Sequence, residues 1–342
     1  MALLFCDGFD SYAATADLIK KWSSNDSSLF TWASSGGPSG GGGNCISVAS
    51  ASGGSLRKQG RDVNSSRHND TVMFWFKFSA VPASSIIFFQ FLGGSGAPSL
   101  KVTSTGKLQA TCTGGGLTAT TTASYCDNAW HHAELQSSYS GSINTLTLRI
   151  DNAQVLVAVD NTGSSQFTDT ITFFNITAAV TFSLDDVIWY DDSGSSFNTF
   201  PVGMRTIETL RPSAAGDETD MTKTGGATNY QSVNEANSDG DSTYVSDTVA
   251  GHYDLYNFGN LSGTPATIDA VVVNNHARSA GGIPTIRAKA KSGTTIADGS
   301  SVQVPAQAYT MKQEAFVVDP NTSAAWAAAG VNGAQFGVEL VS

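Results

Sequence analysis

The sequence has 342 residues, a formal net charge of −11 and a charged fraction of only 14%, with 35 glycines. A length of this order predicts about two domains, and so low a charged fraction, against about 25% in ordinary soluble domains, is typical of β-sandwiches rich in Ser, Thr and Gly. An acidic chain offers no positive field for phosphate backbones, which excludes nucleic acid as a partner. No apolar run approaches the roughly 20 residues of a membrane-spanning helix, which excludes membrane insertion.

The start of the chain and its cysteines indicate the compartment. The first apolar run ends at Asp7 and follows no basic segment, so we expect no signal peptide and synthesis in a cytoplasm. The four cysteines, Cys6, Cys45, Cys112 and Cys126, are then expected to be reduced, and none has the spacing of a zinc site. Because Cys112 and Cys126 flank a Gly/Thr-rich hairpin-like stretch, a disulfide between them is the alternative after release into an oxidising medium.

The first half of the chain has the pattern of one large sandwich. Two short apolar segments cut by aspartates, 3–10 and 183–190, are interpreted as its first and last strands. Residues 71–78 alternate with an aromatic core face, and 86–92 is apolar on both faces, as in a central strand. Further strands are predicted at 130–136, 145–150, 155–159 and 171–175, with a helical turn at 17–22. The predicted domain covers 1–192.

The second half is predicted to be a smaller sandwich. A polar, turn-rich segment, 193–204, is predicted to be a linker, and 205–342 the second domain. Its expected strands are 205–210, 230–233, 253–258, 268–273, 286–291, 302–304, 311–318 and 336–341. Asn321 is predicted to cap a short Ala-rich helix, with Trp326 packing it onto the sheet. The expected fold class is therefore all-β, with two tandem β-sandwiches, the second of seven or eight strands.

Catalytic groups are not indicated. A retaining glycosidase needs two carboxyl groups about 5 Å apart, and the first 192 residues contain one glutamate, Glu134, whose strand offers no second acid. Asp185 and Asp186 are adjacent and are expected to point to opposite faces of a strand. His131 and His132 diverge in the same way, and no nucleophile motif accompanies them. We therefore predict that the protein is not an enzyme.

Aromatic side chains are the remaining route to ligand binding in the first domain. Trp32, Trp75 and Tyr139 are candidate glycan-binding residues, since rings stack on sugars beside Asn and Asp hydrogen bonders. Packing in the core explains such rings equally well. The sequence alone does not decide between glycan binding and core packing for these rings.

Acidic turns are candidates for calcium. Asp239 and Asp241 place carboxylates at alternate positions around a glycine turn, and Asp185, Asp186 and Asp191 lie together near the end of the first domain. Calcium takes six to eight oxygens, and neither run supplies the full set. Solvated acidic turns are the default, so no cofactor is predicted apart from this Ca²⁺ alternative.

Three segments of the first half resemble a known fold. Residues 4–9, 130–135 and 184–190 together resemble the strands of the concanavalin A-like jelly roll of the laminin-G and pentraxin type. The Glu-x-Asp-x-x-Glu signature of its glycosidase branch is absent. The resemblance implies the fold and no activity.

The second half resembles a module of virion proteins in tailed bacteriophages and prophages, on the residues 207–212, 229–235, 241–245, 254–256, 319–320, 326 and 335–338. This resemblance implies a virion structural protein, such as a tail fibre, a tail-tip or collar protein, or a capsid decoration protein. It implies a virion location, other virion proteins and further copies of the chain (a homo-oligomer) as partners, and host surface polysaccharide as a ligand of the first domain. The alternatives are a free-standing carbohydrate-binding, lectin-like protein and, less favoured, a polysaccharide-degrading enzyme.

Overall fold

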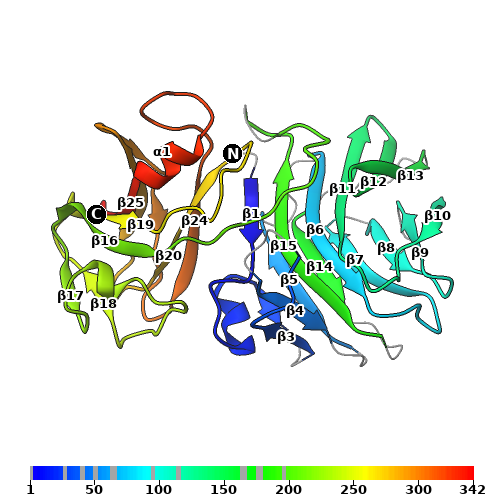
Figure 1. Ribbon diagram of the computed structural model, residues 1–342, viewed down its shortest axis with the longest axis horizontal. Helices are drawn as coiled ribbons and strands as arrows, with labels where there is room; N and C mark the ends of the chain where they lie inside the picture. Colours follow the sequence, from blue (N-terminus) through cyan, green and yellow to red (C-terminus); the bar gives the residue numbers. More distant parts are fainter. Residues whose placement is uncertain are drawn as a thin grey trace. The chain divides into compact units, whose positions relative to one another are not determined.

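The computed structural model describes residues 3–25, 29–38, 43–48, 53–61, 68–93, 97–112, 117–161, 168–174, 180–194 and 198–342. The described chain is mostly antiparallel β-sheet (Figure 1), and it divides into two compact units, Met1–Ile207 and Glu208–Ser342. The predicted fold class, all-β with tandem sandwiches, is confirmed. No helix within the described ranges has both the length and the apolar character needed to cross a membrane.

The first unit is a jelly-roll sandwich of two sheets. One sheet contains β1 (Leu3–Asp7), β3 (Phe30–Ala33), β4 (Cys45–Val48), β6 (Asp70–Phe78), β11 (His131–Ser140), β12 (Ile143–Ile150), β13 (Ala153–Asp160) and β15 (Phe182–Asp191). The other contains β2 (Ser24–Asn25), β5 (Ser55–Gln59), β7 (Ile86–Leu92), β8 (Ser99–Val102), β9 (Lys107–Thr111), β10 (Thr118–Ser124) and β14 (Thr170–Phe174). A 3₁₀ helix, Thr15–Lys20, replaces the helical turn expected at 17–22. The first and last predicted strands, β1 and β15, pair antiparallel (Figure 1).

An aromatic core joins the two sheets. The alternation of β6 directs Phe74 and Phe78 inward, where their ring centroids lie 5.7 Å from Phe89 and 5.2 Å from Phe88 of β7. All four rings are completely buried. Burial of a phenylalanine side chain stabilises a fold by about 1.5–3 kcal/mol relative to exposure, so these rings fix the spacing of the sheets.

Residues 199–207, which we call the covering segment, lie on the outer face of the first sheet. Val202 and Ile207 pack there on Met73, Ile188 and Tyr190. The segment overlaps the stretch expected to be a linker. No strand forms at 205–210, so that strand prediction is wrong: the segment hydrogen-bonds to side chains of the first sheet and joins no ladder.

The second unit has one larger sheet and two antiparallel ribbons of two strands each. The larger sheet contains β16 (Pro212–Thr219), β19 (Tyr253–Phe258), β21 (Thr285–Ser292), β22 (Thr295–Asp298), β23 (Val302–Gln303) and β25 (Gln335–Leu340). The ribbons are β17 (Thr222–Thr224) with β18 (Tyr244–Ser246), and β20 (Val271–Ala277) with β24 (Thr310–Phe316). On the predicted strand β21, Ala288 and Ala290 face the core, while Arg287 and Lys289 bind Glu339 on the other face.

Two local predictions for this unit are corrected. Residues Tyr230–Ser232 form a 3₁₀ helix and not a strand, because Asn229 holds the preceding turn by donating from its side-chain amide to Met221 and Asp254. The short helix α1 is Ala328–Gly333 and does not begin at Asn321, which lies in a turn bonded to Asp319. Trp326 packs on the sheet as expected, with 3% of its surface exposed.

Candidate functional site

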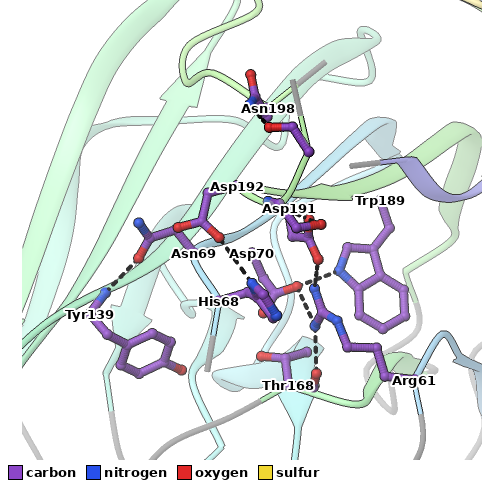
Figure 2. A network of polar contacts seen from close by, with 12 residues as sticks. Arg61, His68, Asn69, Asp70, Tyr139, Thr168, Trp189, Asp191, Asp192 and Asn198 are labelled. Atoms are coloured by element: carbon purple, nitrogen blue, oxygen red, sulfur yellow. Dashed lines mark hydrogen bonds and ion pairs between the residues drawn. The ribbon is translucent and has the colours of Figure 1, made fainter. Parts of the chain in front are cut away.

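The ends of three neighbouring strands form a pocket in the first unit (Figure 2). Its volume is about 260 Å³, and its lining residues are His68, Asn69, Tyr139, Gly141 and Asp192. His68 and Asn69 precede β6, Tyr139 lies near the end of β11, and Asp192 follows β15. Because β6 lies between β11 and β15 in the sheet, these strand ends lie side by side at one end of the sheet. The amide of Tyr139 donates to the Asn69 side-chain oxygen at 2.8 Å.

A buried network of charged residues lies next to these strand ends (Figure 2). Arg61 donates to Asp70 at 2.8 Å and to the Thr168 carbonyl at 2.7 Å, and it also pairs with Asp191. Trp189 donates its indole N–H to Asp70 at 2.9 Å. Burial raises the pKa of Asp70 to about 7, against the opposing charge of Arg61. One guanidinium therefore fixes the positions of two carboxylates that belong to different strands.

The pocket surface carries a histidine–aspartate pair. His68 Nδ1 and Asp192 Oδ1 are 3.2 Å apart, with side chains 29% and 40% exposed. The nitrogen of His68 and carboxylate oxygens of Asp191 and Asp192 all lie within 4.8 Å of one another. No other group of three metal-ligating side chains this close occurs in the part of the chain that the structure describes.

The three predicted glycan-binding residues are not brought together. Tyr139 lines the pocket. Trp75 on β6 donates its indole N–H to the Arg205 carbonyl of the covering segment at 2.9 Å, and Trp32 on β3 donates to the Phe9 carbonyl at 2.9 Å. Trp75 lies opposite His132, seven residues along β11 from Tyr139, which is about 23 Å at the rise of a strand. The tryptophans therefore serve packing at their own positions.

The candidate calcium ligands Asp239 and Asp241 lie in the second unit and are used for other contacts. Asp241 accepts hydrogen bonds from Arg278 and from the Tyr309 hydroxyl, each at 2.7 Å. Asp239 accepts from the amide of Thr243 at 3.2 Å and from its hydroxyl at 3.0 Å. The contacts of Asp241 hold the acidic turn against the residues that flank β20 and β24.

The cysteines are free thiols. Cys112 donates to the Ala158 carbonyl at 2.9 Å and Cys126 to the Gly106 carbonyl at 3.6 Å, so the alternative of a Cys112–Cys126 bridge does not correspond to the structure. Burial raises the pKa of both thiols to about 11. Thiolate, the reactive form, is therefore scarce at neutral pH.

The acids considered for catalysis are engaged inside the fold. Glu134 Oε1 accepts from the Val202 amide at 2.6 Å and from the Tyr190 hydroxyl at 3.2 Å, and Oε2 accepts from the Gly203 amide at 3.2 Å. Asp185 and Asp186 are both buried at a bulge in β15. Burial, together with repulsion from neighbouring aspartates, raises the pKa of both. None of these carboxyl groups lines the pocket.

The adjacent histidines have separate roles. His132 accepts a hydrogen bond from the Arg205 amide at 3.4 Å, and burial lowers its pKa to about 4, so its imidazole is neutral. His131 lies nearer the surface, between Asp127 and Asp151. Sequence reasoning identified Tyr139 but not His68, Asn69 or Asp192. Their only signal is position, since each lies within three residues of a predicted strand.

No protein-family model and no curated protein matches the sequence. Solved structures similar to the chain include a sialidase, with a TM-score of 0.39, 12% identity, and coverage of 55% of this chain and 18% of that one. The binding domain of botulinum neurotoxin DC has a TM-score of 0.34 and 13% identity, with coverage of 43% of this chain and 39% of that one. An endo-1,3-β-glucanase from Streptomyces sioyaensis has a TM-score of 0.36 and 12% identity, with coverage of 56% of this chain and 96% of that one. The chain thus spans well under two thirds of the sialidase and of the toxin domain. At such distances we draw no residue-level inference from these proteins.

Proposed function

We propose that the protein is a non-enzymatic glycan-binding protein and that sugar binds in the pocket of the first unit. The observation that carries the proposal is the composition of the pocket, an aromatic side chain, Tyr139, beside the polar groups of His68, Asn69 and Asp192. Small-molecule sites combine such apolar surface with a few convergent polar groups. An open pocket at the ends of rigid strands can accept the terminal sugar or a branch of a polysaccharide.

The charge of the pocket favours neutral over acidic sugars. Asp192 is 40% exposed there, while the Arg61 guanidinium beneath is only 9% exposed and is paired with two carboxylates. In the metal-free pocket a uronic or sialic acid would meet the Asp192 carboxylate, and the described lining residues include no lysine or arginine. Neutral hydroxyl groups can donate to Asp192 and to the Asn69 oxygen.

The absence of an enzymatic role is part of the proposal. It is supported by Glu134, whose carboxylate is bonded to the covering segment, and by the burial of Asp185 and Asp186 away from the pocket. A retaining glycosidase would need two accessible carboxyl groups about 5 Å apart.

We further propose that the chain is a structural component of a tailed-bacteriophage particle, with other virion proteins and copies of itself as partners. The resemblance of residues 205–342 to virion modules supports this role. One stacked ring contributes about 1–3 kcal/mol if nucleic-acid bases are a guide, so one pocket binds weakly. Many copies on a particle would convert weak contacts into avidity. Mass spectrometry of purified particles tests this role, and consistent absence of the chain from them contradicts it.

Retention on immobilised host polysaccharide tests the glycan site. We expect the full chain to be retained on neutral polysaccharide, with Tyr139→Ala reducing retention about tenfold, since about 1.4 kcal/mol is one factor of ten. Tyr244→Ala, in β18 of the second unit, is the matched control and should bind normally. Equal loss in both variants, or no retention of the unmodified chain on any neutral polysaccharide, contradicts the site. Release of reducing ends contradicts the non-enzymatic role.

A further inference from the structure

At one side of the pocket three possible metal donors lie close together, and one pair of them has the spacing of neighbouring ligands around an ion. His68 Nδ1 and Asp192 Oδ1 are 3.2 Å apart, and an Asp191 oxygen lies within 4.8 Å of both. With metal–ligand bonds of about 2.1 Å, neighbouring donors in tetrahedral or octahedral geometry lie about 3.0–3.4 Å apart and opposite donors about 4.2 Å apart. From this geometry we infer that His68, Asp191 and Asp192 bind a divalent transition-metal ion.

Uncompensated charge around these residues supports a cation. Asp70, Asp191 and Asp192 carry three carboxyl groups, and among the described residues of this network Arg61 is the cation, paired with Asp70 and Asp191. Three carboxyl groups therefore share one guanidinium, so the network has room for a further cation. Burying charge without a partner is costly, so bound metal would relieve the network.

A buried oxygen next to the cluster points the same way. Asp70 is completely buried, and its Oδ2 has no hydrogen-bond partner among the described residues. Asp70 and the proposed ligand Asp191 pair with the same Arg61 guanidinium. The unpartnered carboxylate oxygen therefore belongs to the network that holds the proposed ligands.

The three ligands remain available for coordination. Asp191 Oδ1 accepts from the Ser193 amide at 2.8 Å, and its Oδ2 pairs with Arg61. Because a carboxylate has about four acceptor positions, Oδ2 retains one. Both His68 and Asp192 are partly exposed to the pocket, which provides an entry path. An imidazole with two carboxylates suits Zn²⁺ or Mn²⁺, whereas Ca²⁺ prefers six to eight oxygens.

Two other histidines among the described residues contact aspartates without this geometry and serve for comparison. His131 meets Asp127 through Nε2 and Asp151 through Nδ1, so its two carboxylates lie at opposite nitrogens and cannot share one ion with it. His252 Nδ1 lies 3.0 Å from Asp247, yet this pair belongs to no group of three ligating side chains among the described residues.

Isothermal titration of the tag-free, metal-stripped full chain tests the site. We expect one equivalent of ZnCl₂ or MnCl₂ to bind more tightly than CaCl₂, and Asp192→Asn to weaken binding by about tenfold or more. His68→Gln should do the same, while His252→Gln and Asp247→Asn leave binding unchanged. Circular dichroism confirms folding of each variant. Because the titration uses metal alone, its result is independent of the proposed glycan binding.

Two outcomes overturn the inference. One is the absence of saturable Zn²⁺ or Mn²⁺ binding by the folded, unmodified chain. The other is unchanged affinity in the folded Asp192→Asn variant, or an equal loss in Asp247→Asn, because either places the ion elsewhere. Binding of Ca²⁺ more tightly than both transition metals contradicts the assignment of the metal class.

Discussion

Glu134 is predicted to hold the covering segment on the first sheet. Its carboxylate accepts the amide hydrogens of Val202 at 2.6 Å and Gly203 at 3.2 Å, and 1% of the residue is exposed. Hydrogen bonds to a charged group contribute about 1.5–3 kcal/mol each. Glu134→Ala removes both and should lower the free energy of unfolding of the first unit by about 3–6 kcal/mol. Glu134→Gln keeps one acceptor and should cost about half as much.

Trypsin provides the assay, because Arg205 lies in the covering segment. Its amide is bonded to His132 and its carbonyl to Trp75 in the native chain, so cleavage after Arg205 requires the segment to detach. We expect slow cleavage in the unmodified chain and much faster cleavage in Glu134→Ala. Gln136→Ala is the control, since this residue lies two positions along β11 and bonds only weakly to a side chain of β6, at 3.4 Å. Equal cleavage of Glu134→Ala and the unmodified chain would refute the reasoning.

Three further predictions concern stability. Folding raises the pKa of Asp185 and Asp186, so the free energy of unfolding should fall as pH rises above about 4. The decrease is at most about 1.4 kcal/mol per pH unit for each group. Urea titrations at several pH values measure this slope, which Asp185→Asn should reduce. Arg61→Gln leaves Asp70 and Asp191 without their cation and should lower the free energy of unfolding by about 3–5 kcal/mol. A decrease below about 1 kcal/mol, the contribution of one weak hydrogen bond, would contradict the network. Trp326→Ala should destabilise the second unit by about 3–5 kcal/mol in the same titration, and an unchanged midpoint would show that this indole is not part of its core.

Periodicity predicted eight of the fifteen strands that the structure describes in the first unit. The alternation over residues 71–78 predicted β6 within one residue, because one of its faces is the aromatic core. The aspartate-cut segments at the two ends predicted β1 and β15 as the first and last strands, and the structure adds that these two strands pair. A strand with one strongly apolar face carries its register in its own sequence.

The site depended on information that no local pattern contains. His68 and Asp192 lie 124 residues apart and meet only because β6 and β15 pair. Asp191 and Arg61 are likewise joined across 130 residues. The covering segment was missed for a related reason, since its hydrogen bonds go to side chains such as Glu134, and the strand pattern at 205–210 corresponds to no strand.

The covering segment also explains why the candidate site lies at the strand ends. A sheet of a sandwich has an inner face, which the core occupies, and an outer face on which a ligand can lie. In this unit the outer face over β6 and β15 is occupied by Val202 and Ile207, and Trp75, an aromatic ring on that face, already donates to Arg205. Along these central strands, the ends are the part left open to a ligand. Side chains presented from strand ends are positioned by the rigid sheet beneath them, so Tyr139, Asn69 and Asp192 can form a defined pocket without a binding face of their own.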